Sequence, residues 1–263
     1  MQTTLIHLQR RIEALAPAGQ RPADMQDLIT LGDEQVDATL GAALVRGALH
    51  ELYAAGSAHA AALTGFCAGL ARCITSGTRK TVWIRQTFSE TEAGHLFMPG
   101  LAALGFDPAT IIHVQTRRSE DGLRAALEAV RCASLGAVVI ELWGNPKSLD
   151  LTATRRLTLA AEASGVTPLL LRVAAEPGPS VARTRWQVAA APSSALAANA
   201  PGKPAFDITL LRNRAGASGQ RWHLEWDHER KHFRQAAALS GGVAAIPDQR
   251  PVPASVQRFA RAV

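Results

Sequence analysis

One stretch of the chain, residues 54–61, has the position of a phosphate-binding loop but few of its residues. It follows a short apolar run, 48–53, and overlaps the start of an Ala- and Leu-rich run, 58–70, so the pattern predicts a strand, a turn and a buried helix. A nucleotide-binding protein of this layout carries G-x-x-x-x-G-K-[ST] here, where the glycines admit phosphate, the Lys binds it and the hydroxyl holds magnesium. This chain has AAGSAHAA, with Gly56 and Ser57 set among alanines.

Each substitution in this loop removes a separate function. Ala54 and His59 stand in place of the two glycines, Ala60 in place of the Lys, and Ala61 in place of the hydroxyl. If a lost charge-assisted contact costs roughly 1.5–3 kcal/mol, losing the Lys and the hydroxyl weakens nucleotide binding roughly a hundredfold to ten-thousandfold. We therefore expect a degenerate loop with no cofactor and no catalysis, whose helix amides hold an anion weakly. The alternative is a strand, turn and helix with no such ancestry.

Two further side chains, Glu141 and the loop residue His59, could also carry charge. Glu141 lies at the end of the apolar run AVVIEL, residues 137–142, and ligands of parallel sheets bind at that end of a strand. Without a phosphate-bound metal, a local ion pair is the favoured role for Glu141, and a metal-side role is the alternative. His59 is expected to be a solvated loop residue rather than a ligand.

Composition is that of a globular chain and excludes several classes of protein. The 263 residues are 47% hydrophobic and 19% charged, which favours one main α/β domain over a disordered chain. No apolar run is long enough to cross a bilayer and no secretory signal is visible, so we expect a cytoplasmic protein without membrane contact. The net charge of +6 is only a weak sign of nucleic acid or an acidic partner, because the arginines are scattered. Cys67, Cys73 and Cys132 form no C-x-x-C pair, which predicts buried thiols and no metal site.

Strand-like and helix-like runs alternate through the middle of the chain. The predicted strands are 48–53, 81–85, 111–115, 137–142 and 167–173, and the predicted helices are 58–70, 91–104, 120–135 and 149–164. This alternation implies a mostly parallel, twisted sheet with helices on both faces. Three later runs, 185–190, 206–211 and 221–227, are joined by glycine-rich links and predict antiparallel strands at one edge. Trp222 and Trp226 are expected to face the same side of the last strand, where core packing is favoured over a partner surface.

The two ends of the chain differ from this core. Residues 1–36 are interpreted as a separate N-terminal helix and linker, residues 37–228 as the core, and residues 229–263 as a mobile tail. The helix carries one apolar stripe, which needs a partner and is therefore a candidate binding surface; its members are Leu5, Leu8, Ile12 and Leu15. The stripe either docks on its own domain or packs on another protein.

From residue 37 to residue 227 the order of elements resembles the RecA-like ATPase core, and specifically the ImuA family of RecA-related accessory proteins. LGAALVRGALHELY, residues 40–53, is similar to the segment that leads into the RecA phosphate loop. LAALGFDPATIIHVQ, residues 101–115, is similar to a RecA helix end and the next strand. SEDGLRAALEAVRCASLGAVVIEL, residues 119–142, resembles the helix and Walker B strand, and LLRNRAGASGQRWHLEWD the closing hairpin. The resemblance puts Glu141 at the metal-side carboxylate position.

Departures from the RecA pattern are as informative as the matches. Arg85-Gln86-Thr87 stands near the position of the RecA acid that activates water, and no carboxylate can be placed there from the sequence. The segments 144–149 and 174–182 match the regions of the RecA DNA-binding loops but are short, with Lys147 and Arg183 as the nearest cations. The resemblance therefore implies neither ATP hydrolysis nor a DNA filament formed by this chain alone.

Arg212-Asn213-Arg214 resembles the Lys-Asn-Lys of RecA, whose lysines reach the nucleotide of the adjacent protomer. Guanidinium groups suit such a phosphate contact across an interface. We therefore take Arg212 and Arg214 as candidate partner-binding residues that could complete the site of a neighbouring RecA. Two solvated arginines on a hairpin are the simpler alternative.

The function implied by the resemblance is that of a non-catalytic RecA-like adaptor in SOS-induced, error-prone translesion DNA synthesis and DNA repair. Its implied partners are RecA, the polymerase-like ImuB, and through ImuB an error-prone replicative-type DNA polymerase, with any DNA contact indirect. One alternative is a RecA-type DNA-dependent ATPase, which needs the phosphate chemistry that Ala60 and Ala61 lack. Another is a cell-division inhibitor resembling SulA, whose smaller size is an argument against it.

Overall fold

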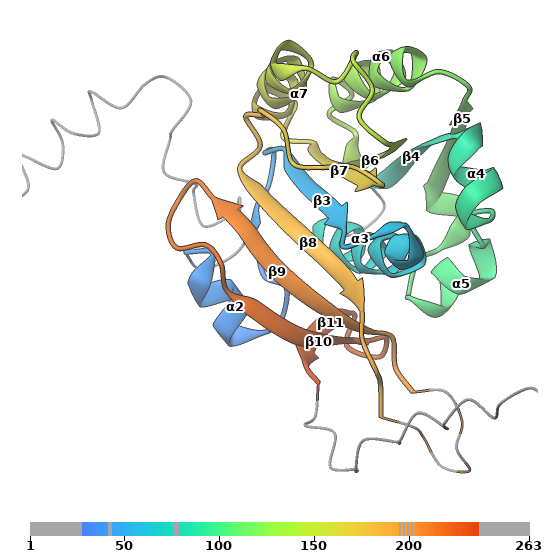
Figure 1. The fold of residues 1–263 in the computed structure, drawn as a ribbon, viewed down its shortest axis with the longest axis vertical. Coiled ribbons are helices and arrows are strands. Elements are labelled where there is room, and N and C mark those ends of the chain that lie inside the picture. The colour runs from blue at the N-terminus through green and yellow to red at the C-terminus, as the bar shows by residue number, and fades with distance from the viewer. Residues whose placement is uncertain are drawn as a thin grey trace, which may run out of the picture.

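A nine-stranded sheet runs through the molecule in the computed structural model, which describes residues 28–41, 44–75, 79–194, 196, 198, 200 and 202–236. Its strand order is β11-β10-β9-β8-β3-β7-β6-β4-β5 (Figure 1). The strands are β3 (His50–Ala54), β4 (Lys80–Gln86), β5 (Ile111–Thr116), β6 (Leu135–Trp143), β7 (Thr167–Val173), β8 (Thr184–Ala190), β9 (Ala205–Asn213), β10 (Arg221–Asp227) and β11 (His232–Gln235). A separate two-stranded sheet pairs β1 (Leu28–Ile29) with β2 (Leu44–Val45).

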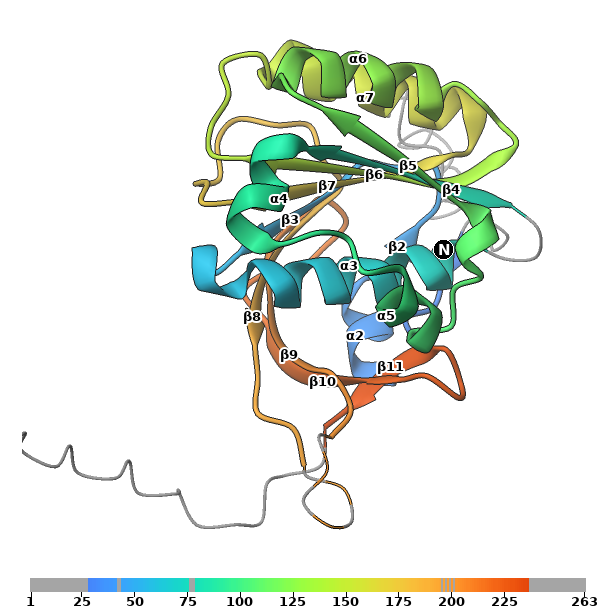
Figure 2. The same cartoon turned by 90° about the vertical axis from the view of Figure 1, so that its right-hand side faces the viewer.

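Helices cover both faces of the sheet. They are α2 (Glu34–Thr39), α3 (Ala60–Ile74), α4 (Thr87–Ala93), α5 (Met98–Ala103), α6 (Ser119–Val130) and α7 (Leu151–Ser164), with short 3-10 turns η2 (Ser57–His59) and η3 (Pro108–Thr110). Helix α3 packs on one face, and α6 and α7 lie together on the other (Figure 2). Strands β6 and β7 are buried almost throughout because both of their faces are covered, which explains their unbroken apolar sequences.

The sheet changes character at β8. From β8 through β5 all neighbouring strands are parallel, whereas β8, β9, β10 and β11 pair antiparallel. This arrangement confirms the predicted fold class: a mostly parallel sheet with helices on both faces and antiparallel strands added at one edge. The antiparallel strands curve around α3, so this helix is enclosed between the two parts of the sheet (Figure 2).

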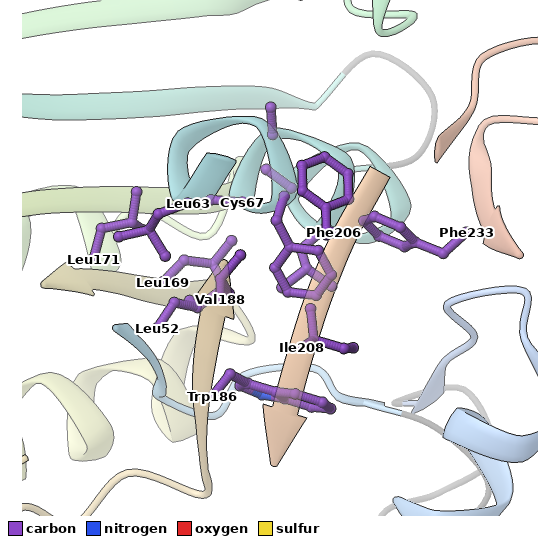
Figure 3. Close-up of a cluster of buried hydrophobic side chains, with 14 of the residues drawn as sticks. Leu52, Leu63, Cys67, Leu169, Leu171, Trp186, Val188, Phe206, Ile208 and Phe233 are labelled. Carbon is purple, nitrogen blue, oxygen red and sulfur yellow. The ribbon is translucent and has the colours of Figure 1, made fainter. Parts of the chain in front are cut away.

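Aromatic side chains fill the space between α3 and the curved strands. Phe66 of α3 lies 4.8 Å, centroid to centroid, from Phe233 of β11 and 5.7 Å from Phe206 of β9. Figure 3 shows Phe206 and Phe233 beside α3. Gly69 lets these rings approach the helix, because a Cβ at that position would lie 2.5 Å from Cζ of Phe233. Trp226 packs on Phe233 with a 4.9 Å centroid distance, so it belongs to the core, as the sequence predicted.

Two predicted helices have different bounds in the structure. The helix expected at 91–104 is two helices, α4 and α5, because the chain leaves α4 through Gly94 at a φ of +79° and runs extended to Met98. The helix expected at 120–135 ends at Val130, since residues 131–134 form the turn that lets β6 begin at Leu135. Cys132 lies in that turn and is exposed, which corrects the prediction that all three thiols are buried.

Both proposed domain borders also need correction. The segment assigned to an N-terminal linker contains β1 and the start of α2, with Leu31 and Val36 fully buried. The segment assigned to a mobile tail contains β11, whose Phe233 is fully buried and whose backbone N–H donates to the carbonyl oxygen of Leu31. The apolar stripe of the predicted N-terminal helix, Leu5 to Leu15, lies outside the described residues, as do residues 237–263. Within the described ranges, no helix has the length and apolarity that crossing a membrane requires.

Candidate functional site

The loop at residues 54–61 joins β3 to α3, as expected for a phosphate-binding loop. Ala54 ends β3, Gly56 and Ser57 lie in the turn, and α3 begins at Ala60. The Ala60 methyl group packs into the core at 4% exposure, and Ala61 is exposed on the first turn of the helix. In the alignment that the sequence suggests, these two methyl groups stand where a phosphate loop has its ammonium and its magnesium hydroxyl, and the strand–turn–helix layout is the one expected.

His59 holds this loop against β8. Its Nδ1 accepts a hydrogen bond from the Ala190 backbone N–H at 3.1 Å. On the other side of the turn, the Ala55 N–H donates to the Val188 carbonyl oxygen at 2.9 Å. The ring is half-buried and its hydrogen bond lies at the surface, so His59 is a partly solvated loop residue that also contacts β8. The large imidazole at the second glycine position thus has a structural role, which is to fix the turn to the neighbouring strand.

Glu141 forms a buried ion pair with Arg85 rather than facing an open site. Arg85 Nε lies 2.9 Å from Oε1 of Glu141, with the two side chains 3% and 1% exposed. The β4–β6 register places these two residues directly side by side, and Arg85 Nη1 also donates to the Gly94 carbonyl oxygen at 2.6 Å. Burial raises the pKa of Glu141 and the Arg85 guanidinium opposes that rise. Of the two roles considered for Glu141, the geometry is that of the local pair.

One carboxylate lies close to the Arg85-Gln86-Thr87 segment, and the sequence alone did not single it out. Glu90 of α4 is 8% exposed, and its Oε2 accepts a hydrogen bond from Gln115 Nε2 at 2.6 Å. Burial favours a raised pKa, but the hydrogen bond from Gln115 and the nearby His95 and His113 hold the pKa of Glu90 below its usual value. Nothing in SETEAG distinguishes a buried glutamate, because its hydrogen-bond donor Gln115 lies on β5, 25 positions later in the chain.

A second buried polar group lies on the α7 side of the sheet. Arg185 Nε lies 2.7 Å from Oε2 of Glu51, which also accepts a 3.2 Å hydrogen bond from the Tyr53 hydroxyl. The Arg172 guanidinium lies 5.6 Å from the centroid of the Tyr53 ring. Burial and the Glu51 charge raise the pKa of Tyr53 to about 12. The sequence signal for this group was the spacing of Glu51 and Tyr53, which are two positions apart and therefore lie on the same face of a buried strand.

Glu51, Tyr53 and Arg172 of this group line a cavity of about 640 Å³ at the carboxyl ends of β3 and β7. The other charged wall residues are Asp150 and Glu176. Uncharged polar side chains come from Asn145, Thr154 and Ser180, and apolar ones from Pro146, Leu149, Leu151, Pro177 and Pro179. Asp150 caps α7 by accepting a hydrogen bond from the Ala153 N–H. Acidic and basic side chains are mixed here, so the cavity has no clear preference for an anion such as a triphosphate.

Arg212 and Arg214 lie far from the degenerate loop. Strand β8 is parallel to β3 with Thr184 beside His50 and Val188 beside Ala54, while Asn213 of β9 lies opposite Thr184. The two arginines are therefore at the start of β3, and the loop is at its end. Arg212 Nη1 donates to the Ser180 carbonyl oxygen at 3.3 Å, and Arg214 Nη1 donates to that of Val181 at 3.2 Å. Within one protomer they cannot reach a nucleotide at residues 54–61.

The described residues contain no group of three His, Cys, Asp or Glu side chains able to hold a metal ion. Cys67 is fully buried on α3, and burial raises the pKa of its thiol. Cys73 lies on the same helix, where burial raises its pKa to about 12. These two cysteines therefore behave as packing groups rather than as ligands.

Comparison with known proteins gives two kinds of similarity. No family model matches the chain. A protein called ImuA from each of two strains of Caulobacter vibrioides is 31% identical over 233 residues, covering 81% of this chain and 90% of the relative. A crystal structure of the RadB recombinase superposes with a TM-score of 0.52 at 12% identity, covering 80% of this chain and all of that one. The second similarity concerns the fold alone and agrees with the RecA-like arrangement of strands.

Proposed function

The chain belongs to the ImuA family, and from that premise we propose that it is a non-catalytic RecA-like adaptor in SOS-induced, error-prone translesion DNA synthesis. In this role it binds RecA and the polymerase-like ImuB, and through ImuB it meets an error-prone replicative-type DNA polymerase. The family resemblance supplies these partners. The proposal that the chain is non-catalytic depends on residues 54–61, which lack the phosphate-binding Lys and the magnesium hydroxyl.

A single observation carries this proposal: the buried ion pair between Arg85 and Glu141. In a working RecA-type ATPase the carboxylate at that position helps to hold the nucleotide's magnesium. Here the guanidinium of a neighbouring strand occupies it at 2.9 Å, and alanines replace the lysine and hydroxyl of the loop. The scaffold is retained where the charges that bind a triphosphate are absent, which supports a role in binding other proteins.

Arg212 and Arg214 are the proposed contact to RecA. They lie at the sheet end opposite the degenerate loop, so an interface there leaves the loop free. Each makes one long hydrogen bond to a backbone carbonyl, which leaves other guanidinium donors for phosphate or carboxylate groups of a partner.

The first experiment measures partner binding. The full chain with Arg212→Glu and Arg214→Glu is compared with wild type in pull-down and light scattering with purified RecA. We expect the double variant to lose RecA binding because a charge-assisted contact becomes a repulsive one. The matched control is Arg221→Glu with Arg230→Glu, which makes the same change in net charge on β10 and the following turn and should bind normally. Unchanged binding by the first variant removes these arginines from the interface.

The second experiment tests the proposal as a whole. The tagged chain is purified from cells before and after DNA damage, and the associated proteins are identified by mass spectrometry. RecA and a polymerase-like protein in the damaged sample are the expected companions. Tight binding and hydrolysis of magnesium-ATP by the purified chain, with neither companion present, would replace the adaptor with the ATPase alternative.

A further inference from the structure

The outer edge of β5 is open. In the nine-stranded sheet β5 is an end strand with β4 as its neighbour, and no other strand of the described residues pairs with it. Figure 2 looks toward this edge and shows β5 at the front, with α6 on one side and α4 and α5 on the other. Unpaired backbone N–H and C=O groups of an end strand can pair with another polypeptide.

The two ends of the sheet differ in protection. At the opposite end, β11 is four residues long, and its Phe233 is fully buried and hydrogen-bonded to the Leu31 backbone. Strand β5 has six residues, IIHVQT, none of which is buried, and Ile112 is 42% exposed. It contains no Lys, Arg, Asp, Glu or Pro, and its pairing with β4 runs without a bulge. Proteins normally protect an end strand with such charges, prolines or bulges, and β5 has none of them.

We propose that β5 is the interface for a second copy of this chain, with the two β5 strands pairing antiparallel across a two-fold axis. Because β5 has no formally charged residue, an antiparallel copy sets no like charges opposite one another. The axis passes at His113 or Val114, because residues directly opposite must lie on the same face of the sheet. Ile112 then lies opposite Val114 or Thr116 of the second copy, so exposed apolar surface is covered in both protomers.

The segments that flank β5 support self-pairing over a foreign strand. The exposed Asp107 precedes the strand. The exposed Arg117 and Arg118 follow it, and Arg118 Nε lies 3.4 Å from Oε2 of Glu120 in the same chain. Antiparallel pairing brings the arginine end of each copy alongside the Asp107 end of the other, twice in one symmetric contact. The contact is therefore self-complementary in charge. It also closes both open edges at once, so the assembly stops at two copies.

The test is the mass of the full chain in solution, by sedimentation and light scattering from about 1 to 100 μM, the range in which a modest contact associates. We expect wild type to shift from monomer to dimer across this range. Ile112→Lys with Gln115→Lys should weaken self-association at least about tenfold, because lysines on an end strand oppose pairing. The control, Leu159→Lys on α7, replaces an apolar residue that is more exposed than Ile112, 56% against 42%, and should dimerise like wild type. Far-UV circular dichroism verifies that each variant is folded.

A charge exchange tests the orientation. Asp107→Lys places like charges at both ends of the contact and should weaken the dimer, and adding Arg117→Asp and Arg118→Asp should restore it. Amide hydrogen exchange should slow in β5, and not in β11, as the protein concentration rises. A wild-type chain that stays monomeric to about 100 μM, or a dimer that survives both lysines, overturns the proposal, as does growth past two copies.

Discussion

At the scale of single residues, structural pairing of charged groups is most evident at Arg85 and Glu141. Both side chains are almost fully buried and 2.9 Å apart. Because water does not reach them, each charge is stabilised by the opposite charge of the other. His59 also has a structural contact, because its ring accepts a hydrogen bond from the Ala190 backbone N–H. These residues join neighbouring parts of the sheet: Arg85 and Glu141 link β4 to β6, and His59 links the β3–α3 loop to β8.

Breaking the buried pair gives the first prediction. Arg85→Met leaves Glu141 buried without its counter-charge and should lower the free energy of unfolding by about 3–5 kcal/mol. The double variant Arg85→Met, Glu141→Leu removes both charges and should recover most of that loss. Urea unfolding at neutral pH measures both. A single variant as stable as wild type would show that water or another group already screens the carboxylate.

His50 gives a prediction for pH. It is fully buried, its Nδ1 lies 2.7 Å from the Thr184 hydroxyl and its Nε2 lies 2.9 Å from the Val45 carbonyl oxygen. Burial is the main cause that lowers its pKa from 6.5 to about 4, so the folded protein keeps the ring neutral. Above pH 6.5 this residue adds no pH dependence. As the pH falls from 6.5 to about 4 the unfolded chain binds a proton that the folded chain does not, and stability declines.

The size of this decline follows from the two pKa values. At 1.36 kcal/mol per pH unit, His50 alone should remove roughly 3 kcal/mol between neutral pH and pH 4. Guanidinium unfolding of wild type and His50→Gln at several pH values isolates the contribution, since Glu90 and Asp227 titrate in both proteins. Parallel stability curves for the two proteins over this interval would contradict the assignment.

At the scale of elements, β11 contributes more than its four residues suggest. Phe233 packs on Phe66, Phe206 and Trp226, and it lies over Gly69 of α3. Truncation of a buried aromatic side chain removes contact area and leaves a cavity. The Phe233 side chain thus joins β11, the last described strand, to helix α3.

This contact predicts the result of shortening the chain. Phe233→Ala should lower the free energy of unfolding by about 3–5 kcal/mol. A chain ending at residue 228, the border suggested by the sequence, should be destabilised at least as much, whereas a chain ending at residue 236 keeps β11. Thermal unfolding of the three proteins decides, and equal melting temperatures for the two shortened chains would argue against the role of β11.

Restoring the phosphate-loop residues between β3 and α3 should restore nucleotide binding but not hydrolysis. Ala54→Gly, His59→Gly, Ala60→Lys and Ala61→Thr together restore the phosphate-loop residues on a backbone that already has the strand–turn–helix layout. Magnesium-ATP affinity should rise roughly a hundredfold to ten-thousandfold, the reverse of the loss expected from the missing contacts. Hydrolysis should remain absent because Arg85 still occupies Glu141. Calorimetry measures the affinity for magnesium-ATP, and phosphate release measures hydrolysis. Hydrolysis by this variant would refute the prediction that it is absent.

At the scale of the whole molecule, the net charge of +6 raises the question of DNA. The basic residues are dispersed. The arginines beside the two short segments after β6 and β7 donate to backbone carbonyls there: Arg172 to Gly144, Arg185 to Gly178 and Arg212 to Ser180. We expect only non-specific binding to single-stranded DNA, with a dissociation constant of roughly 10⁻⁴–10⁻⁶ M at physiological salt. Fluorescence anisotropy over a salt series measures it. Nanomolar binding would require a cation-lined surface that these two segments do not provide.

The parallel half of the fold could be predicted from the sequence because its strands are buried on both faces. AVVIEL and TPLLLRV carry that signal without help from their neighbours. Strand β11 could not, since HFRQ has one apolar residue and is a strand only because β10 and Leu31 hydrogen-bond to it. The break between α4 and α5 was not predicted, because the apolar pattern continues on both sides of Gly94 while the backbone turns at Gly94.

The candidate site was predictable where it depends on consecutive residues and not where it depends on register. The absent lysine and hydroxyl are evident in AAGSAHAA. The partner of Glu141 is 56 positions away, and only the alignment of β4 with β6 brings Arg85 beside it. Glu90 and Gln115 are brought together in the same way across 25 positions. Single-chain patterns contain the types of residues but not these pairings.

The position of β3 between β7 and β8 has a consequence for how the chain emerges from the ribosome. Its His50 and Glu51 bond partners on β8 that are 134 positions later, so the first long strand to be made waits for the last part of the parallel sheet. During that interval its apolar side chains and those of α3 have no lasting cover, which exposes a nascent chain to aggregation. Chaperone supply during synthesis should therefore set the yield of this protein more than the stability of its finished form.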